Sequence, residues 1–456
     1  MSSADSSQED LGENSLLPII DFNVLSADAQ QRALERPQMG DMADIASRVR
    51  ETIADVRTRG DVALLHYAEH YDGGAPQALR VDSKIIDEAM AALGRDALAA
   101  LQRAIGNVRR FHEAQRLAPI TLETEPGVRC ERLLRPIERV GLYVPAGSAP
   151  LPSALIMSAI PAAIAGCPVR ILCTPARGGT VSPVILAAAR LCGIDSIFAI
   201  GGAQAIAGMA YGTETIPKVD KIFGPGSAWV TVAKQQVAQD PEGAAIDLPA
   251  GPSEVMVIAD ETARATFVAA DLLAQAEHDP LSQALLITTS PALAAQVREA
   301  ALRQYQGLSR QSILRESLKR SRLLCVNDLS QAIDIANRYA PEHLLLQVRE
   351  PRQWLDQVTS AGSVFLGDWS PEPMGDYCSG TNHVLPTYGY ARAYSGLSLL
   401  DFSKRITVQE LSADGLRNLG PTASLLAGLE GLDAHALAVN LRLDVLQGVD
   451  AETPTS

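Results

Sequence analysis

Three short segments of this 456-residue chain combine side chains that can bind a metal ion or move a proton. Gln275 and His278 lie three residues apart near the end of an expected helix, which places both heads on one face. Glu342 and His343 are adjacent at an expected helix-to-strand corner, and such a pair can divide two proton transfers. Asp376 lies in a run rich in Gly, Ser, Asn and Pro, which predicts a loop. Each residue alone is more often a cap or a solvated group, so only the set indicates chemistry.

The other histidines are weaker candidates. His66 and His70 lie four residues apart on an amphipathic helix, a spacing that can chelate a metal ion. Because no third ligand is near them, an exposed helix face is the better interpretation. His112 stands alone in a helical stretch. His383 and His435 lie near acids or amides in turn-like contexts, and both stay in the candidate set.

Glycines after short apolar runs indicate turns that could approach a nucleotide. Gly201 and Gly202 follow SIFAI, and the run Gly-Pro-Gly at 224–226 follows KVDKIF. Neither turn matches G-x-G-x-x-G, and no acid stands at the distance that the dinucleotide fingerprint requires. The glycine pattern alone therefore does not establish nucleotide binding.

Alternating strands and helices must position these residues. Residues 41–111 have apolar positions at helical spacing, and short β-rich runs then alternate with helical segments from residue 139 onward. A second alternating series begins at residue 254, after a Pro- and Gly-containing turn at 247–254. Such alternation predicts right-handed βαβ units, and two series predict two parallel sheets.

Composition excludes several classes of protein. The chain has 39 Lys and Arg against 53 Asp and Glu, which argues against nucleic acid and anionic membranes as partners. The six cysteines form no C-x-x-C pair, as expected of reduced thiols in the cytoplasm. Met1–Ser15 has neither a basic start nor an apolar run, so we expect a solvated tail. Leu151–Val169 lacks charges but contains three prolines, which favours a buried helix and strand over a membrane span.

Longer runs of the chain form a set that spans about residues 50–443. These runs are VGLYVPAG, GGAQAIA, KVDKIFGPG, AIDLPAGPSEV, LLAQAEHDP, APEHL, SAGSVFLGDWSPE and GDYCSGTNHVLPT, together with SGLS, TVQEL and the terminal E-x-x-x-x-H. Together they closely resemble one family, histidinol dehydrogenase. The resemblance implies a zinc-dependent, NAD-linked four-electron oxidation of L-histidinol via L-histidinal to L-histidine, the last two steps of histidine biosynthesis.

The resemblance also implies roles for single residues. His343 would take the hydroxyl proton in the first oxidation, and Glu342 would activate water before the second. One Zn²⁺ per subunit would be held by Gln275, His278, Asp376 and His435. Substrate would contact Ser253, Gln275, His278, His343, Asp376, His383, Glu430 and His435, while NAD would contact Tyr143, Gln204 and Ser227.

The implied fold is α/β, with two incomplete Rossmann-like parallel-sheet domains plus small helical N- and C-terminal extensions. The family is a homodimer whose C-terminal segment reaches the neighbouring active site, so Glu430 and His435 would serve the partner's zinc. The expected boundaries are 1–40 for the N-terminal tail and extension, 41–142 plus 254–397 for the first α/β domain with the metal and catalytic residues, 143–253 for the second, NAD-binding domain, and 398–456 for the C-terminal helical extension.

Two positions depart from the family pattern, and three other functions stay open. Ser227 replaces an Asn, and Ala146 replaces a Gly, which concerns NAD affinity rather than reaction type. One alternative is a related zinc and NAD dehydrogenase acting on another polyol or a sulfonate-bearing diol, although Glu430 suits an amine better than an anion. The others are a metallohydrolase with Glu342 as base, and a dimeric metal-binding scaffold without activity.

Overall fold

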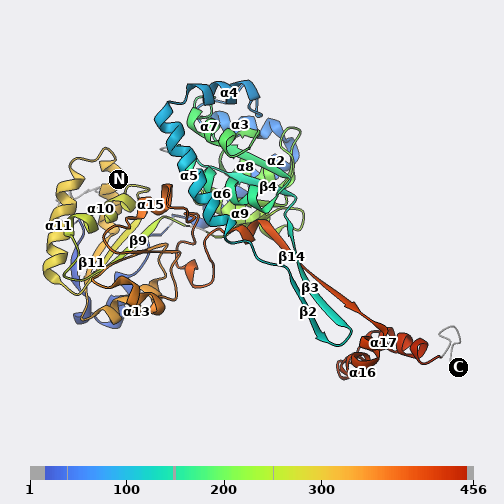
Figure 1. Cartoon of the computed structure of the whole chain (residues 1–456). Coiled ribbons are helices and arrows are strands. Elements are labelled where there is room, and N and C mark those ends of the chain that lie inside the picture. Colours follow the sequence, from blue (N-terminus) through green and yellow to red (C-terminus); the bar gives the residue numbers. More distant parts are fainter. Residues whose placement is uncertain (1–15, 39, 147–149, 250, 449–456) are drawn as a thin grey trace, which may run out of the picture. The chain divides into compact units, whose positions relative to one another are not determined.

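The computed structural model describes residues 16–38, 40–146, 150–249 and 251–448. The predicted tail at Met1–Ser15 lies outside these residues. The chain divides into two compact units, one formed by residues 1–115 and 137–401 and the other by residues 116–136 and 402–456 (Figure 1).

The first unit contains a parallel sheet of five strands with helices packed along it. The sheet consists of β4 (Arg139–Tyr143), β5 (Val169–Thr174), β6 (Ser196–Ala199), β7 (Lys221–Phe223) and β8 (Ala245–Ile246), and its connecting helices are α6 (Pro152–Ala165), α7 (Pro183–Leu191), α8 (Gly202–Tyr211) and α9 (Ala228–Gln239). The strand order is β6-β5-β4-β7-β8. Counted along the chain this is 3-2-1-4-5, the order of a Rossmann sheet without its sixth strand. The buried helix and strand predicted for Leu151–Val169 are present as α6 and the start of β5.

Four helices precede this sheet in the sequence and pack against its helices. They are α2 (Met42–Arg59), α3 (Asp61–Tyr71), α4 (Ser83–Ala92) and α5 (Arg95–Glu113). Helix α2 packs on α8 and α9, α4 packs on α7, and α5 packs on α6. The buried face of α2, with Val49, Ile53 and Val56, joins the core of the five-stranded sheet. The expected boundaries instead grouped these helices with the six-stranded sheet described next. Helical periodicity indicates that a helix has an apolar face, but it does not indicate which sheet that face covers.

The first unit also contains a parallel sheet of six strands. Its strands are β1 (Ile19–Asp21), β9 (Glu254–Ala259), β10 (Gln283–Thr288), β11 (Arg322–Cys325), β12 (His343–Gln347) and β13 (Ser363–Leu366), and its main helices are α10 (Ala265–Ala276), α11 (Pro291–Tyr305), α12 (Gln311–Arg320) and α13 (Leu329–Tyr339). The order β1-β11-β10-β9-β12-β13 is again 3-2-1-4-5, with β1 added at one edge. The prediction of two incomplete Rossmann-like sheets is therefore confirmed.

Short elements complete the first unit. They are η2 (Phe22–Val24), α1 (Ala27–Ala33), α14 (Pro351–Trp354), η3 (Leu355–Gln357), α15 (Glu372–Tyr377) and η4 (Tyr390–Arg392), and η5 (Leu399–Phe402) ends where the second unit begins. The prediction of a loop around Asp376 is wrong for residues 375–377, which belong to α15. Pro373 lies in the first turn of this helix, where its missing N–H costs nothing.

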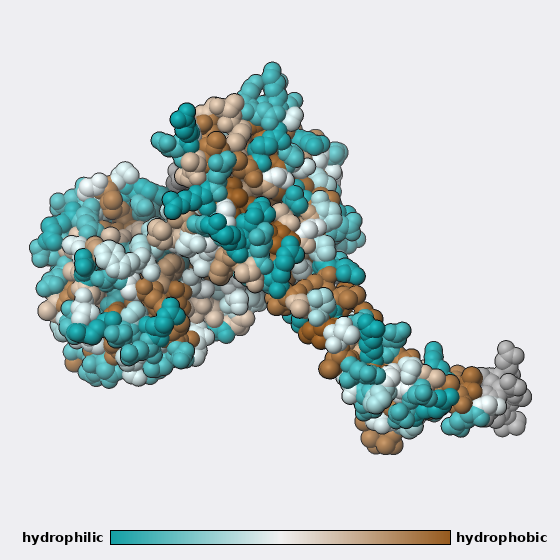
Figure 2. Space-filling view, viewed as in Figure 1, coloured by the Kyte–Doolittle hydropathy of each residue, from teal (hydrophilic) through white to brown (hydrophobic). Residues whose placement is uncertain are grey.

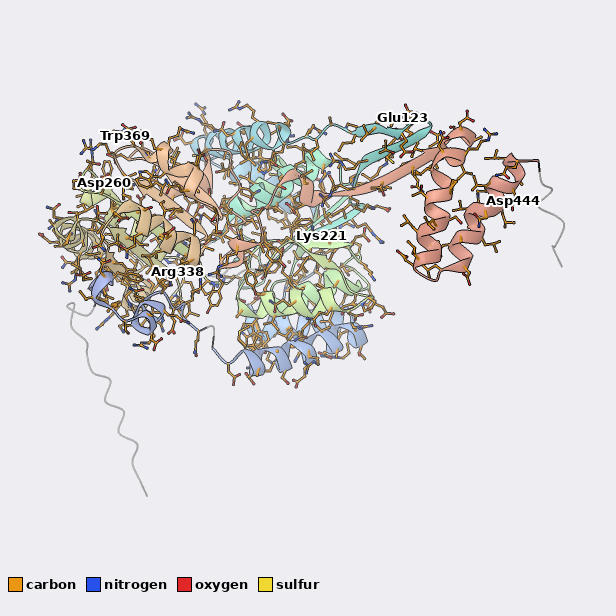
Figure 3. The ribbon with its side chains drawn as sticks, turned by 90° about the horizontal axis from the view of Figure 1, so that it is seen from below. Glu123, Lys221, Asp260, Arg338, Trp369 and Asp444 are labelled. Carbon is orange, nitrogen blue, oxygen red and sulfur yellow. The ribbon has the colours of Figure 1, made fainter. Side chains whose placement is uncertain are left out.

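The second unit is an antiparallel ribbon followed by two helices. The ribbon consists of β2 (Ile120–Glu125), β3 (Val128–Pro136) and β14 (Ser403–Leu411) in the order β14-β3-β2, and the helices α16 (Ala413–Leu429) and α17 (Asp433–Leu446) pack together. Figure 3 labels Glu123 on the ribbon and Asp444 on α17. The C-terminal helices were predicted, but β14 was not, because its residues are mostly exposed and lack a clean alternation. Among the described residues, no helix is long and apolar enough to cross a membrane.

Candidate active site

Glu342 and His343 lie at the amino-terminal edge of the six-stranded sheet. Helix α13 stops at Ala340, which adopts a left-handed conformation (φ 56°) that is uncommon for a residue with a Cβ. The chain then enters β12 at His343. The predicted helix-to-strand corner is therefore present, and both side chains are buried, with exposed fractions of 7% for Glu342 and 3% for His343.

The backbone of Glu254, at the start of β9, contacts both members of this pair. Its N–H donates to Glu342 Oε2 at 2.8 Å, and its carbonyl oxygen lies 3.2 Å from His343 Nδ1. A carbonyl can only accept, so Nδ1 carries the ring hydrogen in this contact and Nε2 is the free ring nitrogen. Gly362 passes so close that a Cβ there would lie 2.6 Å from the Glu342 carbonyl oxygen, which explains the glycine.

Helix α10 brings Gln275 and His278 to the same edge. In a βαβ sheet the helices run antiparallel to the strands, so the carboxyl end of a helix lies beside the amino-terminal ends of the strands. Gln275 lies in the last turn of α10, and His278 follows its end. The partial negative charge at a helix C-terminus favours a cation there. The ligand atoms of His278, Glu372 and Asp376 all lie within 4.8 Å of one another.

The chemistry of these side chains fits a divalent cation. Within the described residues, Gln275 Oε1, His343 Nε2 and Glu372 Oε2 are buried without a hydrogen-bond partner. Buried polar atoms left unpaired are costly, and a bound cation would satisfy the oxygen acceptors. The donors are imidazole, amide and carboxylate groups without thiolates, a set that suits catalytic zinc.

Glu372 was not predicted from the sequence. It lies one helical turn before Asp376 in α15, and its side chain is 1% exposed. Burial raises the pKa of Glu372 to about 8, against the favourable charge of His343. The signal that could have found it is the spacing of four residues between two acids, but this spacing has meaning only if the segment is expected to be helical.

Burial and charge shift the other titrations in opposite directions. Burial raises the pKa of Glu342 to about 8. Burial also opposes ionisation of Asp376, yet the contact with His343 Nε2, 3.5 Å from Asp376 Oδ1, and the nearby imidazoles lower its pKa to about 2. Desolvation lowers the pKa of His343, but the charges of Glu342 and Asp376 outweigh it and raise that pKa to about 10.

Two further imidazoles are kept neutral at this edge. Desolvation lowers the pKa values of His278 and His383, although His278 is open to solvent on one side. Neutral imidazole is the form that can ligate a metal ion. His383 lies beside the Asp376 carbonyl oxygen, with its Nδ1 at 2.7 Å.

Of the residues expected in the zinc and substrate site, those in the first unit gather at one sheet edge. Ser253 immediately precedes β9, and its carbonyl accepts from the Gln283 N–H at 3.2 Å. Glu430 and His435 belong to the second unit, where Glu430 caps α16 and His435 lies in the first turn of α17. The residues at the edge are Ser253, Gln275, His278, Glu342, His343, Asp376 and His383.

A second candidate site lies at the carboxyl edge of the five-stranded sheet. A pocket of about 470 Å³ there is lined in part by Tyr143, Gly202 and Ser227. Tyr143 ends β4, and its hydroxyl accepts from the Gly202 N–H at 3.1 Å. Gly202 begins α8 and Ser227 caps α9, so two helix N-termini border the pocket, as is typical of phosphate sites. Gln204 lies in the first turn of α8 and is buried.

The glycine turn after β7 has a steric cause. Gly224 has φ 122°, and a Cβ at this position would collide with the Tyr143 carbonyl oxygen. The chain therefore crosses close to β4, at the point where the strand order reverses, which is where open α/β sheets bind ligands.

The same pocket contains two residues that sequence reasoning missed, Asp72 and Arg177. Asp72 follows α3, and its Oδ2 is buried without a hydrogen-bond partner in the described residues. Burial raises the pKa of Asp72, against the nearby Arg177 charge. Arg177 Nε donates to the Ala146 carbonyl at 2.8 Å. Each residue directly precedes a pair of glycines, at 73–74 and 178–179, but neither pair immediately follows a strand, and only the fold brings Asp72 and Arg177 to one pocket.

The chain is similar over almost its whole length to one group of proteins. The family profile described as histidinol dehydrogenase matches residues 35–443. Among curated relatives with that name, the Vibrio parahaemolyticus protein is 54% identical over 422 residues, covering 92% of this chain and 97% of the relative. The Escherichia coli K12 relative is 51% identical over 429 residues, covering 94% and 98%. A crystal structure of histidinol dehydrogenase from Elizabethkingia anophelis matches with a TM-score of 0.89 and 44% identity, covering 95% of this chain and 99% of that chain.

Proposed function

The chain belongs to the histidinol dehydrogenase family, enzymes that oxidise histidinol to histidine in histidine biosynthesis, and from this premise we propose its finer chemistry. The proposed reaction is the four-electron oxidation of L-histidinol via L-histidinal to L-histidine, with one zinc ion per subunit and NAD as electron acceptor. The main support is the buried Glu342–His343 pair, together with the unpaired acceptor oxygens of Gln275 and Glu372 and the cluster of His278 and Asp376.

His343 is the proposed base of the first oxidation. Its Nδ1 is occupied by the Glu254 carbonyl, so Nε2 is the nitrogen that faces the substrate hydroxyl. A cation bound at Asp376 would offset the carboxylate charge that raises the His343 pKa, and Nε2 could then take the hydroxyl proton. Asp376, 3.5 Å from Nε2, stabilises the imidazolium that this transfer creates. Gln275, His278, Asp376 and the partner subunit's His435 would hold the zinc ion. When bound, zinc would supply a positive charge that orients the amino alcohol.

Glu342 is the proposed base of the second oxidation, which needs an activated water. One of its carboxylate oxygens accepts the Glu254 N–H, which leaves the other free to face a water molecule. A pKa raised to about 8 makes this carboxylate a stronger base than an exposed glutamate. Ser253, His383 and the partner subunit's Glu430 would contact the substrate around these groups.

The pocket at the carboxyl edge of the five-stranded sheet is the proposed NAD site. Tyr143, Gln204 and Ser227 would contact the dinucleotide, and the N-termini of α8 and α9 favour its phosphates. NAD, when bound, would accept the hydride in each oxidation. The shorter hydroxyl of Ser227 would weaken one contact without changing the reaction.

We propose a homodimer in which each active site is shared. The second unit exposes large apolar side chains, including Leu425 (67%), Leu429 (76%) and Leu437 (56%), and Figure 2 shows apolar residues on its surface. Helices with this much exposed leucine are stabilised when a partner covers them. The six free cysteines fit a reducing compartment, and we place the enzyme in the cytoplasm.

The ratio of NADH formed to L-histidinol consumed tests the proposal. Zinc-loaded protein should form two NADH per L-histidinol, chelation should abolish the reaction, and added zinc should restore it. One NADH per L-histidinol would limit the chain to the alcohol oxidation. Hydrolysis of a substrate without NADH would instead favour a metallohydrolase.

A further inference from the structure

We propose that the buried ion pair of Arg36 and Glu254 is a positioning device for the acid–base pair, and that the N-terminal segment is therefore part of the active-site architecture. This inference rests on the proposed roles of Glu342 and His343. Arg36 lies in the segment that follows α1, 218 positions before Glu254. It touches neither substrate nor metal in this proposal and acts through Glu254.

Glu254 orients both catalytic side chains with its backbone alone. Its N–H fixes one oxygen of the Glu342 carboxylate at 2.8 Å, and its carbonyl fixes the His343 tautomer at 3.2 Å. Any shift or rotation of this one peptide segment moves both groups together. A displacement of about 1 Å at a catalytic group can cost about a hundredfold in rate.

The Glu254 side chain is held by a planar, bidentate contact with the Arg36 guanidinium. Arg36 Nε and Nη2 donate to its two carboxylate oxygens at 2.5 and 3.0 Å, and the guanidinium lies 3.8 Å above the Tyr339 ring centroid. Arg36 Nη2 also donates to the Tyr339 carbonyl at 2.8 Å. The side chains are only 13% and 2% exposed, so the geometry has little freedom. Lysine could not reproduce this fork.

Stability alone does not explain a buried pair of this kind. Desolvation of two charges roughly cancels their attraction, and apolar residues of similar volume often stabilise a protein as well or better. Burial raises the pKa of Glu254 despite the adjacent Arg36, whereas the Glu254 charge raises the pKa of Arg36 despite its burial, so the two partners indicate opposite balances of desolvation and attraction.

Backbone strain is concentrated around the same pair. In the described residues, the non-glycine residues with positive φ are Leu17, Ala340 and Tyr388. Two of the three contact the ion pair, because the Ala340 carbonyl lies 3.5 Å from Arg36 Nη2 and the Tyr388 N–H donates to Glu254 Oε1 at 2.9 Å. Strained backbone persists where the surroundings fix it, which is common at functional sites.

Arg36→Leu in the zinc-loaded protein tests the inference. We expect kcat for both L-histidinol and L-histidinal to fall at least about tenfold, with each KM within about twofold and an unchanged zinc content. Deuterium exchange of the amides in segment 252–256 should become faster in the substrate-free protein, because the Glu254 side chain loses the Arg36 contact that holds this segment in place. Val297→Ala, in the buried face of α11, is the control for loss of stability without a change at the site.

The double variant Arg36→Leu, Glu254→Gln separates positioning from the penalty of a lone buried charge. Removing both charges should restore stability, whereas kcat should stay low because the fork is gone. Recovery of kcat with stability, equal losses in Val297→Ala, or changes in KM as large as those in kcat would overturn the inference. If the wild type itself formed no NADH from L-histidinol, the proposed function would fail instead.

Discussion

Replacing Glu342 by Gln should separate the two oxidations. The amide has nearly the same size, and its oxygen can still accept the Glu254 N–H that lies 2.8 Å from Glu342 Oε2. The substitution therefore removes the basic carboxylate while leaving the corner between α13 and β12 intact. Because water must be deprotonated only before the second oxidation, the variant should release L-histidinal and form close to one NADH per L-histidinol instead of two.

The size of the effect follows from the role of each group. A positioned general base contributes about 10²–10⁴-fold, or about 3–5 kcal/mol of activation free energy, and this is the expected loss in the second step. The first step should also slow, but by less than about tenfold, because His343 itself is retained. The loss arises because the Glu342 charge is the main factor that raises the pKa of His343, and removing this charge makes the imidazole a weaker base.

The assay measures NADH formation in single turnovers from L-histidinol and, separately, from L-histidinal supplied as substrate. A carbonyl trap should capture the accumulated aldehyde only in the variant. Glu261→Gln is a matched control, because this exposed glutamate lies beyond the opposite end of β9. Equal losses in both oxidations would refute the division of roles between Glu342 and His343.

Three other results are expected. His278→Asn should lower zinc content and activity together, whereas His66→Asn, on the exposed face of α3, should change neither; a metal-free His278 variant with full activity would remove zinc from the mechanism. Burial raises the pKa of Asp271 to about 7, above the ordinary 3.8, so the folded state binds a proton that the unfolded state releases, and stability falls as pH rises. In chemical denaturation, Asp271→Asn should remove about 2 kcal/mol of this loss between pH 5.5 and 8. An unchanged dependence of stability on pH would show that Asp271 ionises normally. Mixing inactive His435 and His343 variants should restore about a quarter of the activity through hybrid dimers, since one site in each hybrid is intact; no recovery after proven subunit exchange would place each site within one chain.

The sequence predicted the parts of the fold that depend on local pattern. Alternating apolar runs predicted both parallel sheets. The common helical face of Gln275 and His278 stays a prediction, because α10 ends at Ala276 and His278 lies beyond it. The adjacent Glu342 and His343 were placed correctly at a helix-to-strand corner, because the end of α13 and the start of β12 both have clear local signals.

Contacts between distant segments could not be predicted in this way. Strand β1 has only three residues, and its pairing with β11 joins positions about 300 residues apart. Arg36 lies in none of the matching runs, and Glu372 is only the last residue of one of them. The importance of both appears only when the fold buries them beside Glu254 and Asp376. The apolar periodicity of α2 likewise does not predict which of the two sheets this helix covers.

The candidate site of the five-stranded sheet lies at its carboxyl edge, and that of the six-stranded sheet lies at its amino-terminal edge. The carboxyl edge of the six-stranded sheet therefore has no proposed role in the reaction. The loops there follow the carboxyl ends of the strands, and Figure 3 labels Asp260 and Trp369 in two of them. Trp369 is 80% exposed. A fluorophore or immobilisation anchor attached at the exposed Glu261, in the loop after β9, should leave turnover intact, which would give biosensor designers an attachment point on a working dehydrogenase.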